Sequence, residues 1–188
     1  VIGLLYRSPL FQIIGDEGNG YYGTAYAIYS MILMIATYSI PTAVSKIISG
    51  KLALGEYRNA RRVFKCAFIY VVSVGLVAAV LTFAFAPALV KEQPNAILSL
   101  QILAPTIFLS GFLAIYRGYL QAYKTMIPTS ISQIIEQIAN AVVSVLAAYL
   151  MSRPFVPGTS EHAKYGAAGS AMGTGAGVLC GIIYILIA

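Results

Sequence analysis

Long apolar stretches alternate with short polar stretches along this chain of 188 residues. About 20 predominantly apolar residues, rising about 1.5 Å each, cross the hydrocarbon core of a bilayer as an α-helix. On that measure the pattern predicts six membrane-spanning helices, at about residues 1–14, 22–44, 63–89, 96–119, 128–151 and 166–188, of which the first is truncated. These stretches lack the regular apolar and polar alternation of a barrel strand. We therefore predict an all-α membrane protein, a bundle of about six transmembrane helices.

Composition favours a membrane protein over a soluble one. Hydrophobic residues make up 59% of the chain and charged residues 10%, whereas a soluble domain is about 45–50% apolar and about 25% charged. So few charges cannot cover the surface of a soluble domain of this length. A bilayer, in contrast, solvates apolar surface directly.

The net charge of +6 is concentrated on one side of the predicted bundle. That side carries Lys46, Lys51, Arg58, Arg61, Arg62, Lys65, Arg117 and Lys124, and the opposite side carries Lys91, Arg153 and Lys164. The positive-inside rule predicts that the first side, with the basic loop 46–65, faces the cytoplasm. Because the basic cluster lies between apolar spans, we expect a membrane surface as its partner and no nucleic acid.

The stretch from Lys51 to Arg62 is too polar to span a bilayer. Its leucines and tyrosine can face lipid while its basic residues face headgroups, which is typical of a short interfacial helix. A plain solvated loop explains the same residues equally well. Both interpretations stay open at this point.

Arg7 is the most informative single residue, because it lies in an apolar stretch two positions before Pro9. A charge inside a membrane is costly, by about 2.5 kcal/mol or more on insertion scales, and usually faces a cavity or a partner. Pro9 removes a helical hydrogen bond and so frees a backbone carbonyl. A guanidinium suits phosphate, since its donors bind two oxygens at once. We predict a kinked helix with Arg7 in a polar cavity; snorkelling to an interface, or pairing with a carboxylate, is the alternative.

The fifth span carries a polar stripe on one helical face, at spacings of three, four, seven and eleven residues: Gln133, Glu136, Gln137, Asn140 and Ser144. Lipid would penalise such a face, so it should point inward. We predict a cavity lining, with Glu136 as a proton or cation site or as the counter-charge of an arginine. Interhelical hydrogen bonding that only holds the bundle together is the alternative.

Two further patterns concern packing. Tyr22, Tyr26 and Tyr29 share one face of the second span. We interpret Tyr22 as part of an interfacial aromatic belt with some core packing, and leave open whether Tyr26 and Tyr29 line a path for sugar rings. In the sixth span, glycines recur at every fourth position from 169 to 181, which predicts close helix packing.

Catalysis, metal binding and a bound cofactor are not predicted. The only histidine lies in a loop, and no nucleophile stands near a base. Gly18, Gly20 and Gly23 match the spacing of a dinucleotide fingerprint, but that motif needs a preceding strand. We interpret these glycines as an external turn between two membrane helices.

Several short motifs resemble a known family of membrane proteins. They are Tyr6–Leu10 (YRSPL), Ile14–Gly18 (IGDEG), Val44–Lys46 (VSK), Tyr116–Gln121 (YRGYLQ) and Ser132–Gln137 (SQIIEQ). In this order they resemble the polysaccharide biosynthesis and stage V sporulation protein B group. That group belongs to the multidrug/oligosaccharidyl-lipid/polysaccharide exporter superfamily, which also contains the lipid II flippases and the MATE exporters.

The resemblance implies two six-helix lobes that face each other across a central cavity. The chain starts at Val1 and ends inside an apolar stretch, so we expect residues 1–188 to be an N-terminal lobe whose C-terminal lobe is missing. Arg7 matches the intramembrane arginine of the family's first motif, which implies a contact with the lipid diphosphate. Arg117 and Glu136 match the second block and are implied to lie in the cavity.

The first hypothesis is therefore a flippase of the bacterial cytoplasmic membrane. It would move an undecaprenyl-diphosphate-linked oligosaccharide or peptidoglycan precursor by alternating access, with coupling to a cation gradient or to the membrane potential left open. The second hypothesis is a cation-coupled multidrug exporter, in which Glu136 binds the ion or the drug. A non-transporting membrane scaffold is the third, and the charge of Arg7 argues against it.

Overall fold

The computed structural model describes residues 7–37 and 40–187; at residues 7–9, 36–37 and 40–41 it describes the backbone alone. The described chain is helical and contains no strand. Its elements are α2 (Arg7–Thr37), α3 (Ile40–Ala53), α4 (Tyr57–Leu89), the 3-10 helix η1 (Pro94–Ala96), α5 (Ile97–Ala122), α6 (Ile127–Ser152) and α7 (Ser160–Ile187). The predicted all-α fold class is confirmed.

Four stretches of the described chain are long and apolar enough to cross a membrane: Tyr57–Leu89, Pro94–Ala122, Ile127–Ser152 and Ser160–Ile187. The outer face of α4 shows why a bilayer is needed. Ile69, Leu76 and Phe83 each expose more than half of their surface, and a soluble helix would bury such side chains. The chain is a multi-pass membrane protein.

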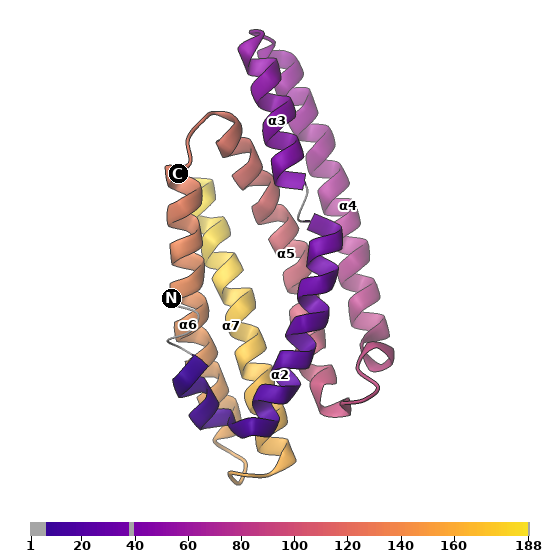
Figure 1. Cartoon of the computed structure of the whole chain (residues 1–188), viewed down its shortest axis with the longest axis vertical. Coiled ribbons are helices and arrows are strands. Elements are labelled where there is room, and N and C mark those ends of the chain that lie inside the picture. The colour runs from indigo at the N-terminus through magenta and orange to yellow at the C-terminus, as the bar shows by residue number, and fades with distance from the viewer. Residues whose placement is uncertain (1–6, 38–39, 188) are drawn as a thin grey trace.

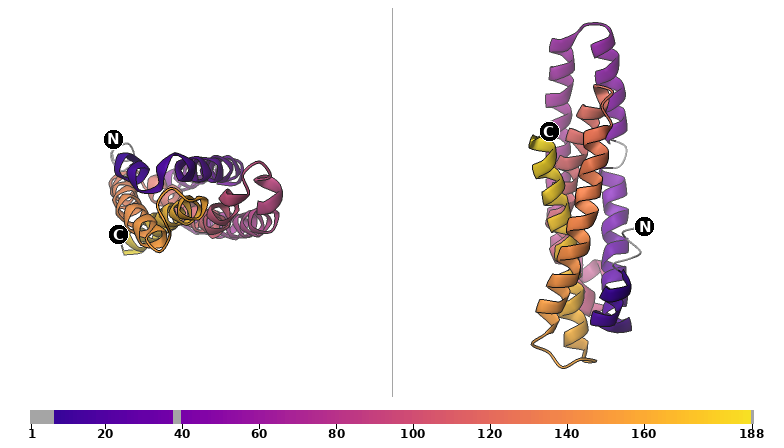
Figure 2. Two further views of the ribbon diagram at one scale, coloured as in Figure 1. Left: turned by 90° about the horizontal axis from the view of Figure 1, so that it is seen from below. Right: turned by 90° about the vertical axis from the view of Figure 1, so that its left-hand side faces the viewer.

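The helices form two layers (Figures 1 and 2). One layer is a row in the order α6, α7, α5 and α4, in which each helix packs on the next. The other layer is formed by α2 and α3, which follow one another along the same face of that row and pack on α7, α5 and α4. The hairpin of α3 and α4 projects beyond the other helices at one end (Figure 2, right).

The first two predicted spans meet in α2, which is interrupted at Gly15. This residue has φ 67° and ψ −176°, a backbone conformation that is accessible almost only to glycine. The chain changes direction there (Figure 1). The predicted external turn at Gly18 to Gly23 is therefore wrong in position, because these residues are helical. One glycine outside the right-handed region suffices to redirect the chain.

The basic loop between the second and third spans is a tight helical hairpin. α3 continues to Ala53, α4 begins at Tyr57, and Gly55 between them has φ 72°. Glu56 accepts hydrogen bonds from Asn59 Nδ2 at 3.0 Å and from Lys51 Nζ at 2.8 Å. The Asn59 hydrogen bond, and then that from Lys51, lower the pKa of Glu56. Of the two predictions for this stretch, the plain loop is wrong, because most of its residues are helical and a short hydrogen-bonded turn joins α3 to α4; an interfacial position stays a prediction.

The glycines of α7 pack against the backbone of α6, as predicted. A Cβ atom added at Gly169 would lie 2.5 Å from the carbonyl oxygen of Ala147, and one at Gly177 would lie 2.7 Å from that of Glu136. Only glycine permits this approach. The contact places α6 along α7 over its whole length and sets the height of the α6 polar residues in the bundle.

Candidate functional site

A polar cavity of about 470 Å³ opens between the two layers. Its lining residues belong to α2, α3, α5, α6 and α7. The lining residues are Tyr26, Tyr29, Leu33, Thr42, Ser110, Leu113, Ala114, Arg117, Gln121, Gln133, Glu136, Gln137, Asn140 and Thr174. The cavity thus gathers Arg117, Tyr26, Tyr29 and four members of the α6 stripe, all of them residues that the sequence singles out.

The polar stripe of α6 divides into two parts with different surroundings. Gln133, Glu136, Gln137 and Asn140 line the cavity. Ser144 is fully buried and donates a hydrogen bond either to Asn140 Oδ1 at 2.8 Å or to the carbonyl oxygen of Ser170 in α7 at 3.1 Å. The two interpretations of the stripe therefore apply to different positions: the first four residues face polar space, and Ser144 joins helices.

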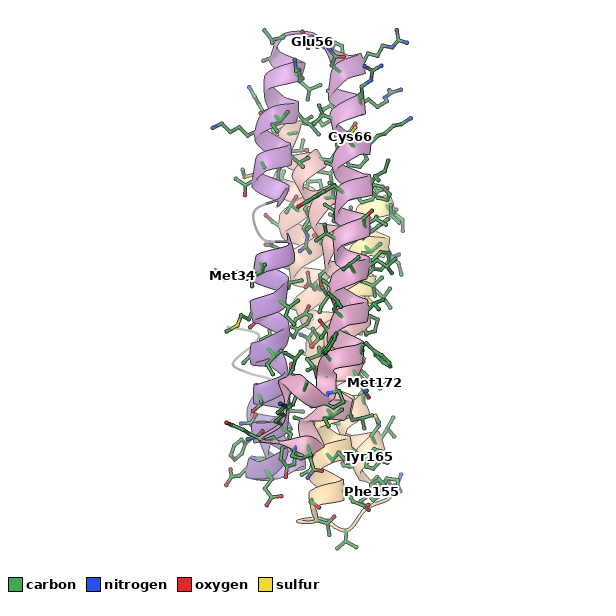
Figure 3. The ribbon with its side chains drawn as sticks, turned by 90° about the vertical axis from the view of Figure 1, so that its right-hand side faces the viewer. Met34, Glu56, Cys66, Phe155, Tyr165 and Met172 are labelled. Carbon is green, nitrogen blue, oxygen red and sulfur yellow. The ribbon has the colours of Figure 1, made fainter. Side chains whose placement is uncertain are left out.

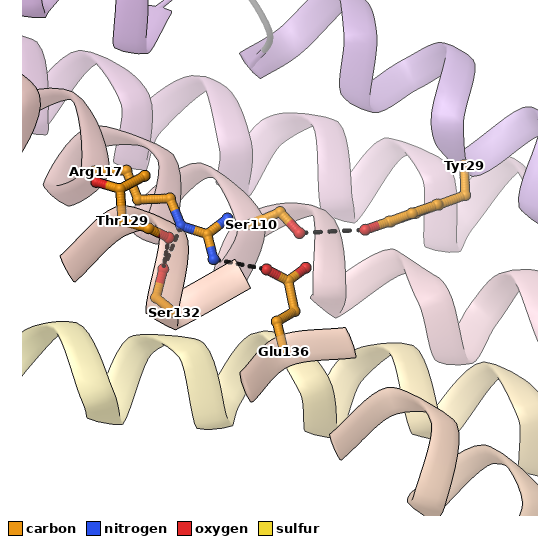
Figure 4. Close-up of polar contacts among 6 residues, drawn as sticks. All are labelled: Tyr29, Ser110, Arg117, Thr129, Ser132 and Glu136. Carbon is orange, nitrogen blue, oxygen red and sulfur yellow. Dashed lines mark hydrogen bonds and ion pairs between the residues drawn. The ribbon is translucent and has the colours of Figure 1, made fainter. Parts of the chain in front are cut away.

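An ion pair between α5 and α6 lies at one end of the cavity (Figure 4). Arg117 Nη2 donates to Glu136 Oε2 at 2.8 Å, and Arg117 Nε donates to Ser132 Oγ at 2.9 Å. Ser132 in turn donates to the carbonyl oxygen of Thr129 at 2.8 Å. Among the predicted roles of Glu136, the structure shows the counter-charge of an arginine, and that arginine is Arg117.

The pair is partly shielded from solvent. The side chains of Arg117 and Glu136 expose 15% and 22% of their surface. One hydrogen bond to Ser132 holds the guanidinium, and the backbone of Glu136 is held by its contact with Gly177. Because charges attract more strongly where water is partly excluded, this pair should constrain the distance between α5 and α6. These two helices otherwise touch little.

The tyrosines of α2 form the wall opposite α6. The rings of Tyr22, Tyr26 and Tyr29 follow one another with centroids 5.7 Å apart at each step. The hydroxyl groups of Tyr29 and Ser110 are hydrogen-bonded at 3.2 Å. Tyr22 is only 4% exposed and lies 3.4 Å from the hydroxyl group of Thr174. Of its predicted role, an interfacial belt with some core packing, the structure shows the core packing, because α2 packs directly on α7 at this level.

Sequence analysis missed four polar lining residues, Thr42, Ser110, Gln121 and Thr174, and it also missed Ser132, the hydrogen-bond partner of Arg117. A signal was present for three of them. Gln121 lies four residues after Arg117, Ser110 lies seven before it, and Ser132 lies four before Glu136, so each shares a helical face with a recognised residue. Thr174 stands among small residues of α7 and carried no such signal.

Arg7 begins α2, but its side chain lies outside the described part of the structure. Its predicted place in the cavity stays a prediction. Within the described residues, no group of three or more histidine, cysteine, aspartate or glutamate side chains is placed to hold a metal ion.

Comparison with known proteins identifies relatives among bacterial membrane proteins. The chain is 23% identical to the lipid II flippase MurJ of Bacillus subtilis over 98% of its own length and 36% of that protein. It is 24% identical to stage V sporulation protein B of the same organism, over 100% of its length and 35% of that protein. It is 26% identical to the uncharacterized membrane protein YabM of that organism, over 76% of its length and 26% of that protein. The chain thus spans about a third of the curated relatives it matches.

No solved structure matches the chain. The family model described as polysaccharide biosynthesis protein matches residues 1–187. This match covers all the helices and the whole cavity lining, and it agrees with the resemblance carried by the short motifs. The chain belongs to the polysaccharide biosynthesis protein family.

Proposed function

We propose that this chain forms one lobe of a flippase that moves a lipid-diphosphate-linked sugar or peptidoglycan precursor across the bacterial cytoplasmic membrane. The family match and the likeness to a lipid II flippase support a transporter rather than an enzyme. The part of such a protein beyond this chain would supply a second lobe that closes the cavity. Alternating exposure of the cavity to the two sides of the membrane would then carry the cargo.

The observation that carries this proposal is Arg117 in the cavity. A guanidinium has five N–H donors in a planar fork that suits phosphate oxygens. The hydrogen bonds to Ser132 and Glu136 use Nε and Nη2. Further N–H groups of the same side chain are therefore available to a phosphate oxygen of the cargo. Arg7, if it faces the same space as its motif predicts, would add a second positive charge for a diphosphate.

Glu136 has a defined part in this mechanism. It neutralises Arg117 while the cavity is empty, which lowers the cost of holding a charge inside the membrane. A phosphate that approaches Arg117 must compete with this carboxylate, so binding is reversible and the cargo can leave. The amide groups of Gln133, Gln137 and Asn140 offer hydrogen bonds to sugar hydroxyl groups, and Tyr26 and Tyr29 offer ring faces for sugar rings.

The orientation of the bundle in the membrane follows from the distribution of its basic residues. The α3–α4 hairpin and the α5–α6 turn lie at the same end of the bundle (Figure 1) and carry most of the basic residues. By the positive-inside rule this end faces the cytoplasm. Arg117 lies towards that end of α5, where a lipid precursor made in the cytoplasm would enter.

A cation-coupled multidrug exporter is the second candidate, favoured by the carboxylate of Glu136 in the cavity. A cationic drug would need to displace Arg117 from that carboxylate at 2.8 Å. A polar cavity wall of glutamine and asparagine side chains also suits sugar better than a hydrophobic drug. We therefore place the flippase first.

The test uses the full-length protein in proteoliposomes and a fluorescent polyprenyl-diphosphate-linked sugar, whose flipping is followed with a membrane-impermeant quencher. We expect Arg117→Gln to slow flipping at least tenfold, and Arg117→Lys to slow it less because it keeps the charge. Lys124→Gln, which removes a basic residue outside the cavity, serves as the matched control. A wild-type rate of flipping in the Arg117→Gln variant would refute the role of Arg117. Loss of drug efflux in the Glu136→Gln variant would favour the exporter.

A further inference from the structure

A second concave surface lies on the face of α5 that points away from the cavity. Ser110, Ala114 and Arg117 line the cavity, whereas Phe108 and Tyr116 line grooves between α5 and α4 on the opposite face. Residues four apart share a helical face, so these two sets mark two sides of one helix. The groove therefore faces away from the space in which a second lobe would close the cavity.

The groove has two stretches separated by a close contact of the helices. The first has a volume of about 280 Å³ and is lined by Phe64, Lys65, Phe68, Ile69 and Tyr116. The second, of about 520 Å³, is lined by Leu76, Ala79, Val80, Phe83, Ala84, Ala104, Pro105, Phe108 and Leu109, with no polar surface. Between them α4 approaches α5 at Gly75, where an added Cβ atom would lie 3.6 Å from Phe108 Cα.

The first stretch ends at a polar cluster at the basic end of the molecule. Lys65 belongs to its lining, and Arg61 and Arg62 lie one helical turn before Lys65 and are exposed. The hydroxyl groups of Tyr119 and Tyr123 are hydrogen-bonded to each other at 3.0 Å. Long side chains with terminal nitrogen atoms project from this end of α4, between Glu56 and Cys66 (Figure 3).

Aromatic rings form the wall between the basic cluster and the helix contact. The ring centroids of Phe64 and Tyr119 are 4.5 Å apart, those of Phe112 and Tyr116 are 4.9 Å apart, and Phe68 packs edge-on against Phe112 at 5.4 Å. Such interlocked rings are rigid, so the groove keeps its shape without a ligand. A rigid apolar groove loses little conformational entropy when a flexible chain binds to it.

The distance along α4 from Lys65 to the helix contact matches one leaflet. Lys65 and Gly75 are ten residues apart on α4, or about 15 Å at the helical rise of about 1.5 Å per residue. Half of a hydrocarbon core of about 30 Å is about 15 Å. A lipid whose phosphate lies beside Lys65 would therefore end its acyl chain near the contact of Gly75 with Phe108.

We propose that this groove binds one anionic glycerophospholipid of the leaflet that faces the basic end. Arg61 and Lys65 bind its phosphate, the hydroxyl groups of Tyr119 and Tyr123 bind its glycerol or headgroup oxygens, and one acyl chain lies along Phe64 and Phe68. The positive cluster gives the preference for a negative headgroup, and the apolar stretch requires an attached chain. The site does not depend on the function proposed for the cavity.

The experiment is native mass spectrometry of the full-length protein, released from detergent after titration with phosphatidylglycerol or with phosphatidylcholine of the same acyl chains. We expect one phosphatidylglycerol to bind more tightly than phosphatidylcholine. Arg61→Gln together with Lys65→Gln should weaken that binding about 30-fold, since each basic contact contributes about 1 kcal/mol. The matched control, Arg153→Gln with Lys164→Gln, removes the same charge from the other end and should bind as wild type.

Two further arms separate a lipid site from a general attraction of anions. Glycerol phosphate, which has the headgroup but no chain, should not displace the bound lipid at millimolar concentration. Because positions 61 and 65 are exposed, the double variant should fold as the wild type does, and the comparison of two lipids on the wild-type protein needs no variant. Equal binding of both lipids, or unchanged binding of phosphatidylglycerol to the double variant, would overturn the proposal.

Discussion

The ion pair of Arg117 and Glu136 allows a quantitative test of how α5 and α6 are held together. Two unit charges about 4 Å apart attract by about 4 kcal/mol at an effective dielectric constant near 20. Part of this is offset by desolvation. Removing one partner of a buried ion pair costs about 3–5 kcal/mol of stability, whereas the coupling energy of a fully exposed ion pair is about 0.2–1 kcal/mol. With 15% and 22% of the side chains exposed, we expect a coupling energy of about 1–2 kcal/mol.

The assay is a double-mutant cycle on the full-length protein, with Arg117→Gln, Glu136→Gln and the double variant. Free energies of unfolding are measured by titration with a denaturing detergent in mixed micelles. The double variant should lose less stability than the sum of the single variants, because each single variant leaves one charge without its partner. Glutamine keeps hydrogen-bonding capacity and similar length, so the cycle isolates the charge.

The chain offers a matched control for this cycle. Lys51 and Glu56 form an ion pair of the same length, 2.8 Å, with 37% and 39% of the side chains exposed. Their cycle should give a smaller coupling energy, since solvent screens the charges. If the Arg117 and Glu136 variants were additive within about 0.5 kcal/mol, the pair would not couple the two helices, and our account of the cavity's geometry would be refuted.

Three further predictions concern the fold. Gly169→Ala places a Cβ atom 2.5 Å from a backbone oxygen of α6 and should cost about 1–3 kcal/mol of unfolding free energy. Gly15→Ala, at φ 67° with open space around it, should cost about 1–3 kcal/mol of unfolding free energy from backbone strain alone. Gly20→Ala is the control for both variants, since position 20 has open space and helical geometry, and this substitution should not destabilise the protein. Because the pKa of Glu56 is lowered in the folded hairpin, its ionised carboxylate stabilises the hairpin. This stabilisation is present above the ordinary pKa of 4.5 and is lost as pH falls through the lower folded pKa. Hydrogen-exchange protection of residues 54–57 should fall over that range, and Glu56→Gln should remove the step.

The helices and the cavity lining were largely predictable from local pattern. Apolar length located the four helices that are long enough to cross the membrane, and the spacing of Gln133, Glu136, Gln137 and Asn140 placed them on one inward face. Glycines at every fourth position predicted close helix packing, which the structure shows between α7 and α6. These features depend on helical periodicity and on the cost of polar groups in lipid, both of which act within a single helix.

Local pattern failed where two elements compete for the same residues. It placed the first turn at the glycines from 18 to 23, but a helix continues there and Gly15 alone changes direction. It left the stretch from Lys51 to Arg62 between two interpretations, because the hydrogen bonds that close the hairpin depend on which rotamers and turn residues meet. It assigned Tyr22 to an interfacial belt with some core packing, and only the packing of α2 on α7 shows how fully this residue is buried.

By itself the sequence determined that this protein is helical, that it resides in a membrane, and which face of α6 is polar, because these properties follow from the solvation of each segment. Only the tertiary structure decided which polar residues meet. Arg117 and Glu136 are nineteen positions apart on different helices, and their contact depends on the angle and separation of α5 and α6, both of which pack on α7. No periodicity within either helix encodes that distance, since it results from the packing of side chains across several helices.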